Sequence, residues 1–286
     1  MKLASFKIGN RQGFGVVTGH GVIELTDLLS GNQKTLHAVL TTNAIDEARA
    51  IAEHAAPDHH FDQIDFELPI LTPEKIYCVG QNYREHIIEM GFDIPSSPSI
   101  FSRYVRTFVP HNGQMVMPSH SSHFDYEGEM TVVIGRPARH VSETDALQYV
   151  AGYTICNDGS VRDWQKAGPQ VAPGKNWEHS GMLGPWIVTT DEAGDPENMP
   201  LTTRVNGEIR QEGNTNDLVF SAAYLVSYIS TFITLMPGDL ITTGSPAGVA
   251  AGFSPPKWLQ PGDRIEIEID SIGCLAANVE ITNKDH

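Results

Sequence analysis

Apolar residues occur along this chain in short runs that turn-forming residues separate. The segments Asp125–Gly135 and Tyr149–Asp158 each contain a continuous apolar, partly β-branched run, which is typical of buried strands. Arg264–Asp270 alternates isoleucine with charged residues and predicts a half-buried strand. In Thr203–Arg210 an Asn-Gly pair lies between alternating residues, which predicts a hairpin with a two-residue turn. The pattern therefore favours strands over helices from about residue 75 onward.

Helical spacing is clearest in Phe220–Phe232, for which Asp217 is the expected N-cap. A second helical stretch is expected at Leu36–Ala55, near the N-terminus. It follows three short strand-like runs: Leu3–Ile8, Phe14–Thr18 and Val22–Leu25. We predict a small N-terminal α+β domain at residues 1–70 and a larger domain at 71–286. The order lacks regular βαβ units, so we expect an α+β fold that is mostly β and not a Rossmann sheet.

Composition narrows the classes of partner. The 286 residues are 40% hydrophobic and carry 19 Lys and Arg against 35 Asp and Glu, a net charge of −16. Such an acidic surface argues against binding nucleic acid or an anionic membrane. No apolar run approaches the roughly 20 residues of a membrane span, and the N-terminus has no apolar signal core. The three cysteines are far apart and indicate neither disulfides nor zinc, so we expect a cytoplasmic protein.

Three carboxylates accompany the two buried strands. Glu127 and Glu129 are two residues apart, so on a strand they face the same side. Asp158 follows the second strand and can reach its neighbour. Buried like charges need compensation, and oxygen ligands suit Mg²⁺ or Mn²⁺. The residues alone leave open a solvated edge strand as the alternative to a metal site.

A histidine and a glutamate share one face of a short predicted helix that ends at Gly91. His86 and Glu89 are three residues apart, and a carboxylate beside an imidazole orients it and makes it more basic. That arrangement suits a general base that activates water. A surface His–Glu pair on an amphipathic helix is the alternative.

Further polar residues could hold an anionic substrate in this acidic chain. They are Arg103, Arg162, Gln165 and Lys175, together with the Gly-rich loop that contains Gly244 and Ser245. Any one of the basic residues, taken alone, is also consistent with an ordinary surface charge.

Taken in order, these motifs resemble the fumarylacetoacetate hydrolase family. The resemblance spans residues 75–282 and rests on Val79–Tyr83, His86 with Glu89, Tyr126–Glu129, Asn157-Asp158, Arg162–Gln165, Gly174-Lys175, Leu183–Trp186, Val205–Glu208 and Thr243–Pro246. It implies a mixed β-roll catalytic domain, usually in a homodimer, with Mg²⁺ or Mn²⁺ (or Ca²⁺ in crystals). It implies metal ligands at Glu127, Glu129 and Asp158, a water-activating dyad of His86 and Glu89, and an active-site lysine at Lys175.

The chain departs from the family pattern at the substrate end. Arg103 stands where bacterial relatives often have Lys in Phe-x-Lys, Ser245 where many have Thr, and Trp177 where Phe is usual. These departures affect substrate identity more than chemistry. Tyr83, Arg103, Arg162, Gln165, Gly244 and Ser245 are the predicted substrate-binding residues.

From the resemblance we predict a metal-dependent hydrolase that cleaves a carbon–carbon bond in an acylpyruvate. Maleylpyruvate or fumarylpyruvate from aromatic catabolism would be such a substrate, a small anionic keto acid. An oxaloacetate decarboxylase or a 2-hydroxydienedioate isomerase on the same site is the alternative, since one fold hosts all three chemistries. A non-catalytic binding protein is the third hypothesis, against which His86, Glu89 and Lys175 argue.

Overall fold

The computed structural model describes residues 1–281, so residues 282–286 of the predicted second domain lie outside the described part. The strands are β1 (Lys2–Ile8), β2 (Arg11–Val17), β3 (Val22–Glu24), β4 (Asp65–Phe66), β5 (Ile76–Gly80), β6 (Ser99–Ser102), β7 (Phe108–Val109), β8 (Gly113–Met117), β9 (Phe124–Asp125), β10 (Gly128–Ile134), β11 (Val150–Asn157), β12 (Ser160–Val161), β13 (Gly181–Thr189), β14 (Pro200–Val205), β15 (Glu208–Asn214), β16 (Leu240–Thr242), β17 (Arg264–Ile269) and β18 (Gly273–Ile281). The α-helices are α1 (Leu36–Thr41), α2 (Ile45–Ala52), α3 (Arg84–Glu89), α4 (Arg162–Gln165), α5 (Ala172–Lys175), α6 (Thr190–Ala193) and α7 (Ala222–Ser230).

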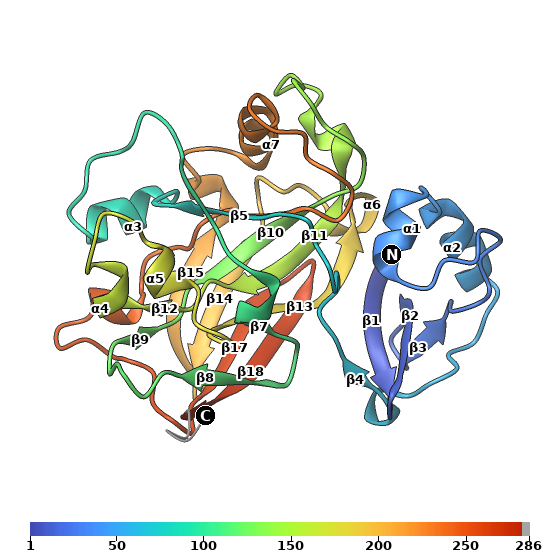
Figure 1. Ribbon diagram of the computed structural model, residues 1–286, viewed down its shortest axis with the longest axis horizontal. Coiled ribbons are helices and arrows are strands. Elements are labelled where there is room, and N and C mark those ends of the chain that lie inside the picture. The colour runs from blue at the N-terminus through green and yellow to red at the C-terminus, as the bar shows by residue number, and fades with distance from the viewer. Residues whose placement is uncertain (282–286) are drawn as a thin grey trace.

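Two large sheets organise the described residues (Figure 1). The first has 11 strands and follows the order β3-β2-β1-β13-β11-β10-β16-β5-β6, with β4 beside β1 and β7 beside β13. The second has five strands in the order β15-β14-β17-β18-β8, and β12 pairs with β9 separately. The fold is therefore α+β and mostly β, as the pattern predicts.

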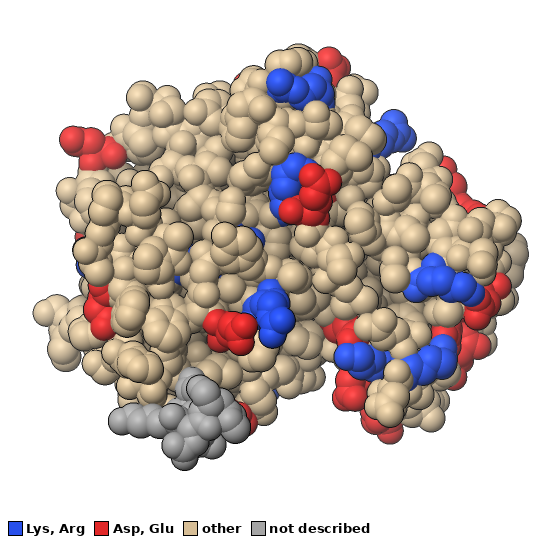
Figure 2. All heavy atoms as spheres, viewed as in Figure 1, with Lys and Arg blue, Asp and Glu red and all other residues tan. Residues whose placement is uncertain are grey.

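The N-terminal strands belong to the first sheet. β1 pairs antiparallel with β13, with Lys2 opposite Val188 and Leu3 opposite Ile187. Figure 1 shows β1, β2, β3 and helices α1 and α2 at the side opposite α3, α4 and α5. Ion pairs lie on the surface of this N-terminal part, among them Lys7 with Glu67 and Arg11 with Glu24. In Figure 2 acidic side chains gather over the same part, beside Lys and Arg. Strand hydrogen bonds between β1 and β13 thus join the predicted N-terminal unit to the sheet of the larger domain.

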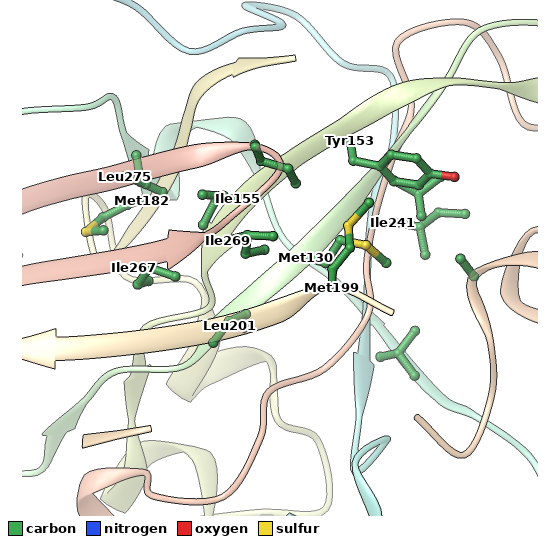
Figure 3. Close-up of a cluster of buried hydrophobic side chains, with 14 of the residues drawn as sticks. Met130, Tyr153, Ile155, Met182, Met199, Leu201, Ile241, Ile267, Ile269 and Leu275 are labelled. Atoms are coloured by element: carbon green, nitrogen blue, oxygen red, sulfur yellow. The ribbon is translucent and has the colours of Figure 1, made fainter. Parts of the chain in front are cut away.

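The core between the two sheets explains the apolar run in β10. Met130 from β10 and Ile155 from β11 pack against Leu201 and Ile267 of the second sheet (Figure 3), and Val132 from β10 belongs to the same cluster. Side chains alternate along a strand, so Glu129 and Thr131 face the other side of the first sheet. The run is continuous because both faces of β10 are buried.

Local sequence signals are confirmed at the Asn-Gly hairpin, where Asn206 and Gly207 have φ of 52° and 79° between β14 and β15. The expected N-cap at Asp217 is wrong: α7 begins later, and the Ser221 hydroxyl accepts the cap hydrogen bond from the Tyr224 N–H. The expected single helix at 36–55 is two helices, α1 and α2. Within the described residues no helix has the length and apolar character needed to cross a bilayer.

Candidate active site

Three carboxylates converge at one end of the first sheet. Glu129 lies in β10, Glu127 immediately precedes it, and Asp158 immediately follows β11. Because β10 and β11 are antiparallel with Gly128 opposite Asn157, Asp158 is brought beside Glu127. One carboxylate oxygen from each residue lies within 4.8 Å of the others, and all three residues are buried. We call Glu127, Glu129 and Asp158 the carboxylate triad.

The glycine inside the Glu-Gly-Glu motif sets the direction of both glutamates. A Cβ on Gly128 would lie 2.3 Å from Thr203 Oγ1 and 3.1 Å from an Ile267 methyl carbon of the second sheet. Only glycine lets the sheets approach here. Its neighbours alternate to the opposite face, so Glu127 and Glu129 point away from the second sheet and toward Asp158.

Three buried cations surround the triad. Lys175 Nζ ion-pairs with Glu127 and lies 2.6 Å from Asp158 Oδ2. Arg162 donates to Glu127 Oε1 at 2.7 Å, and Arg103 donates to Asp158 Oδ1 at 2.8 Å. Because an unpaired buried charge is costly, these cations stabilise the ionised carboxylates of Glu127 and Asp158. They also reduce the electrostatic repulsion between the carboxylates of the triad.

The electrostatic environment distinguishes the two glutamates. Burial by itself would raise the pKa of Glu127, but the charges of Arg162 and Lys175 outweigh burial and lower that pKa well below its usual range. Burial raises the pKa of Glu129, and the neighbouring charges of Asp158 and Glu127 raise it further. Glu129 receives one backbone hydrogen bond, from the Gly244 N–H at 2.8 Å. Glu129 is therefore the triad member whose negative charge is least compensated by the protein.

The triad fits a hard divalent cation. Its three buried carboxylates place ligand oxygens close together. The protein compensates the charge of Glu129 only in part, so a cation bound there would be stabilised electrostatically. Oxygen-only donors favour Mg²⁺ or Mn²⁺ over zinc or copper, which prefer nitrogen and sulfur.

Asp125 supports this site and escaped the sequence analysis. It is 0% exposed, and its Oδ2 accepts from Arg162 Nε at 2.7 Å. Its Oδ1 accepts from the Ala250 N–H at 2.7 Å. Asp125 thus fixes the guanidinium that holds Glu127. The signal that could have found it is a third carboxylate two residues before Glu127.

The predicted dyad forms on α3. His86 Nδ1 lies 2.9 Å from Glu89 Oε2, and the Gly248 N–H donates to Glu89 Oε1 at 3.0 Å. Burial alone would raise the pKa of Glu89, but the hydrogen bonds from His86 and Gly248 outweigh burial and lower it. An ionised Glu89 accepts the Nδ1 proton and leaves His86 Nε2 with the lone pair.

A cavity of about 410 Å³ lies between His86 of the dyad and the triad. Its lining contains His86, the whole triad and Lys175, together with three of the predicted substrate-binding residues, Arg162, Gln165 and Ser245. Gly244 is buried behind Glu129 and contributes its N–H. The structure thus brings the metal-ligand and proton-transfer candidates to one space.

Besides Gly244, two predicted substrate-binding residues do not line this cavity, Tyr83 and Arg103. Tyr83 is 0% exposed, next to α3, and packs in the interior. The Arg103 guanidinium is enclosed by Asp158, by Ser180 Oγ at 2.8 Å and by Thr107 Oγ1 at 3.1 Å, and it stacks over the Phe108 ring. Arg103 therefore orients Asp158 from behind.

Comparison with known proteins agrees with this geometry. The family described as "Fumarylacetoacetate (FAA) hydrolase C-terminal" matches residues 75–280, which is more than half of the chain. The chain belongs to the fumarylacetoacetate hydrolase family. The family relationship confirms the resemblance carried by the sequence motifs.

Relatives in this family differ in their named reactions. The human protein named "Oxaloacetate tautomerase FAHD2A, mitochondrial" is 36% identical over 98% of this chain and 91% of its own length. "Oxaloacetate tautomerase YisK" of Bacillus subtilis strain 168 is 42% identical over 77% of this chain and 75% of its own. The solved maleylpyruvate hydrolase from Sphingobium sp. SYK-6 has a TM-score of 0.83 and 28% identity, covering 99% of this chain and 100% of that one. The family members similar to this chain thus include both tautomerases and a hydrolase.

Proposed function

We propose that this chain is a divalent-metal-dependent tautomerase that interconverts the enol and keto forms of oxaloacetate or a closely similar 2-oxo diacid. The proposal depends on one cavity that is lined by the buried carboxylate triad and by His86, whose Nδ1 contacts Glu89. Support for the substrate class comes from relatives named oxaloacetate tautomerases, at 36% and 42% identity.

The reaction needs one proton moved between two atoms. The enol loses the proton of its 2-hydroxyl, the electrons of the C2–C3 double bond take up a proton at C3, and a C2–O double bond forms. No atom is gained or lost. A general acid–base group near C3 and a positive site near the 2-oxygen are therefore sufficient.

The residues of the cavity supply both. Glu127, Glu129 and Asp158 would hold Mg²⁺ or Mn²⁺, which when bound stabilises negative charge on the 1-carboxylate and 2-oxygen of the substrate. His86, oriented by Glu89, donates or removes the proton at C3. Lys175 adds positive charge on the same wall, which attracts an anionic acid into a protein of net charge −16.

Hydrolysis of an acylpyruvate is the second candidate function. The 2.9 Å contact between His86 Nδ1 and Glu89 favours it, because an oriented imidazole can also deprotonate water. In that reaction hydroxide would attack the 4-oxo carbon, the C3–C4 bond would break, and pyruvate would leave after protonation at C3. Decarboxylation of oxaloacetate needs neither the dyad nor a water.

The test starts from freshly dissolved enol-oxaloacetate with Mg²⁺ or Mn²⁺ and follows loss of enol absorbance. We expect protein-dependent loss that EDTA abolishes, with no matching release of CO₂ or pyruvate. Glu129→Gln should lose the activity, whereas Glu266→Gln, on the partly exposed face of β17, should keep it. Pyruvate release from a panel of acylpyruvates, with no effect on the enol, would replace tautomerisation with hydrolysis.

A further inference from the structure

One lysine at the cavity has no partner of its own. Lys166 lines the same cavity as the triad, and no ion pair, side-chain hydrogen bond or ring contact engages its ammonium group among residues 1–281. Every other lysine in that range either pairs with a carboxylate or, like Lys2, lies over an aromatic ring. In a chain with 35 carboxylates, an unpaired lysine on a cavity wall is available for a ligand anion.

Lys166 follows the helix that carries Arg162. Its N–H donates to the Arg162 carbonyl at 3.1 Å, so Lys166 caps the C-terminal end of α4 one helical turn after Arg162. Arg162 itself reaches Glu127 Oε1 at 2.7 Å. Both residues line the cavity that contains the triad, and Lys166 follows Arg162 by one helical turn.

The adjacent glutamine adds hydrogen-bond donors on the same wall. The Gln165 amide oxygen accepts from Arg162 Nη1 at 3.0 Å, which fixes the orientation of the amide. Since a guanidinium can only donate, the amide NH₂ group is directed away from it. Gln165 lines the cavity beside Lys166. The wall thus offers an ammonium and an amide NH₂ group, both of which are donors to a carboxylate.

We propose that Lys166, with the Gln165 amide, forms a subsite for the second carboxylate of the substrate and so selects 2-oxo diacids over 2-oxo acids with a neutral distal group. This rests on the proposed function for the position of the first carboxylate at the triad. The C1 and C4 atoms of oxaloacetate are three bonds apart, about 3.8 Å when extended. With the first carboxylate at the triad, the distal carboxylate stays within the same cavity, whose lining includes Gln165 and the unpaired Lys166.

The experiment compares probes that differ only at the distal end. Dissociation constants of oxaloacetate, its 4-ethyl ester and pyruvate are measured by calorimetry with Mg²⁺-loaded protein. The wild type should bind oxaloacetate on the order of 10-fold more tightly than the ester, the usual share of a charge-assisted hydrogen bond. Lys166→Met should weaken oxaloacetate binding by that factor and leave ester and pyruvate binding unchanged.

Two further variants control for charge. Lys166→Arg should retain most of the preference for the diacid because it retains a donor cation. Lys257→Met removes a lysine that pairs with Glu208 and lies outside the cavity lining, so it should change nothing. Equal weakening of all three probes by Lys166→Met, or a wild type with no preference for oxaloacetate, would overturn the subsite.

Failure of the Lys166 subsite can be distinguished from failure of the tautomerase proposal. A wild type that does not tautomerise the enol, yet binds the diacid more tightly through Lys166, would overturn the tautomerase and support the subsite. If the wild type tautomerises the enol and Lys166→Met does so with the same KM, the subsite alone is overturned.

Discussion

Replacing Lys175 with methionine removes one buried cation from between two carboxylates and preserves most of the side-chain volume. The ammonium pairs with Glu127 and lies 2.6 Å from Asp158 Oδ2, and the lysine side chain is 3% exposed. Breaking a buried ion pair leaves an uncompensated charge and costs about 3–5 kcal/mol of unfolding free energy. At about 2–4 °C per kcal/mol for a chain of this size, Tm in EDTA should fall on the order of 10 °C.

A divalent cation should restore much of this loss, because it returns positive charge to the same carboxylates. Saturating Mg²⁺ at about 100 times its Kd adds about 2.7 kcal/mol of stability. Thermal unfolding followed by circular dichroism, with EDTA or Mg²⁺, measures both effects. We expect a larger Mg²⁺-induced rise in Tm for Lys175→Met than for the wild type.

The matched control is Lys75→Met, which removes the cation beside a different buried carboxylate. Lys75 Nζ lies 3.0 Å from Asp239 Oδ2, and the Asp239 side chain is 0% exposed. This variant should also lose stability, and Mg²⁺ should restore no more of it than Mg²⁺ adds to the wild type. If Mg²⁺ raises Tm equally in both variants, the charge-compensation argument at the triad is wrong.

Three other predictions rest on other contacts in the structure. His86→Ala should lower turnover by about 10²–10⁴-fold without changing metal or oxalate affinity, and near-normal turnover would remove it from proton transfer. Gly244→Ala should weaken Mn²⁺ binding about 10- to 100-fold, because a Cβ at φ +95° displaces the N–H that donates to Glu129. Gly262 also has φ +95° but has open space around it, so Gly262→Ala should leave Mn²⁺ binding unchanged. The hydrogen bonds from Arg11 lower the pKa of Glu24 from 4.5 to about 2, so the stability that ionised Glu24 contributes is complete above pH 4.5 and is lost toward pH 2. Glu24→Gln should therefore make Tm depend less steeply on pH in this acidic range. An unchanged slope of Tm against pH would contradict this.

The sequence was sufficient where neighbours along the chain determine the geometry. Glu127 and Glu129 share a side because strand side chains alternate, and Asp158 joins them because its strand is the antiparallel neighbour of theirs. The Asn206-Gly207 hairpin likewise follows from local backbone preference.

Contacts between distant segments account for what the sequence did not predict. Arg103 lies behind Asp158 because its guanidinium bonds Ser180, 77 residues later. Asp125 receives a hydrogen bond from Ala250, 125 residues away, which no local pattern encodes. Tyr83 adjoins site residues in sequence, but its ring turns into the interior.

Anomalous X-ray scattering from a crystal grown with Mn²⁺ and oxalate tests the metal assignment most directly. We predict one strong manganese peak among the carboxylates of Glu127, Glu129 and Asp158, with oxygen ligands at slightly more than the roughly 2.0–2.1 Å expected for Mg²⁺ and with oxalate on the open side toward His86. A Glu129→Gln crystal should show a weaker peak or none. Manganese bound elsewhere, with the triad held only by Lys175, Arg162 and Arg103, would contradict the metal assignment.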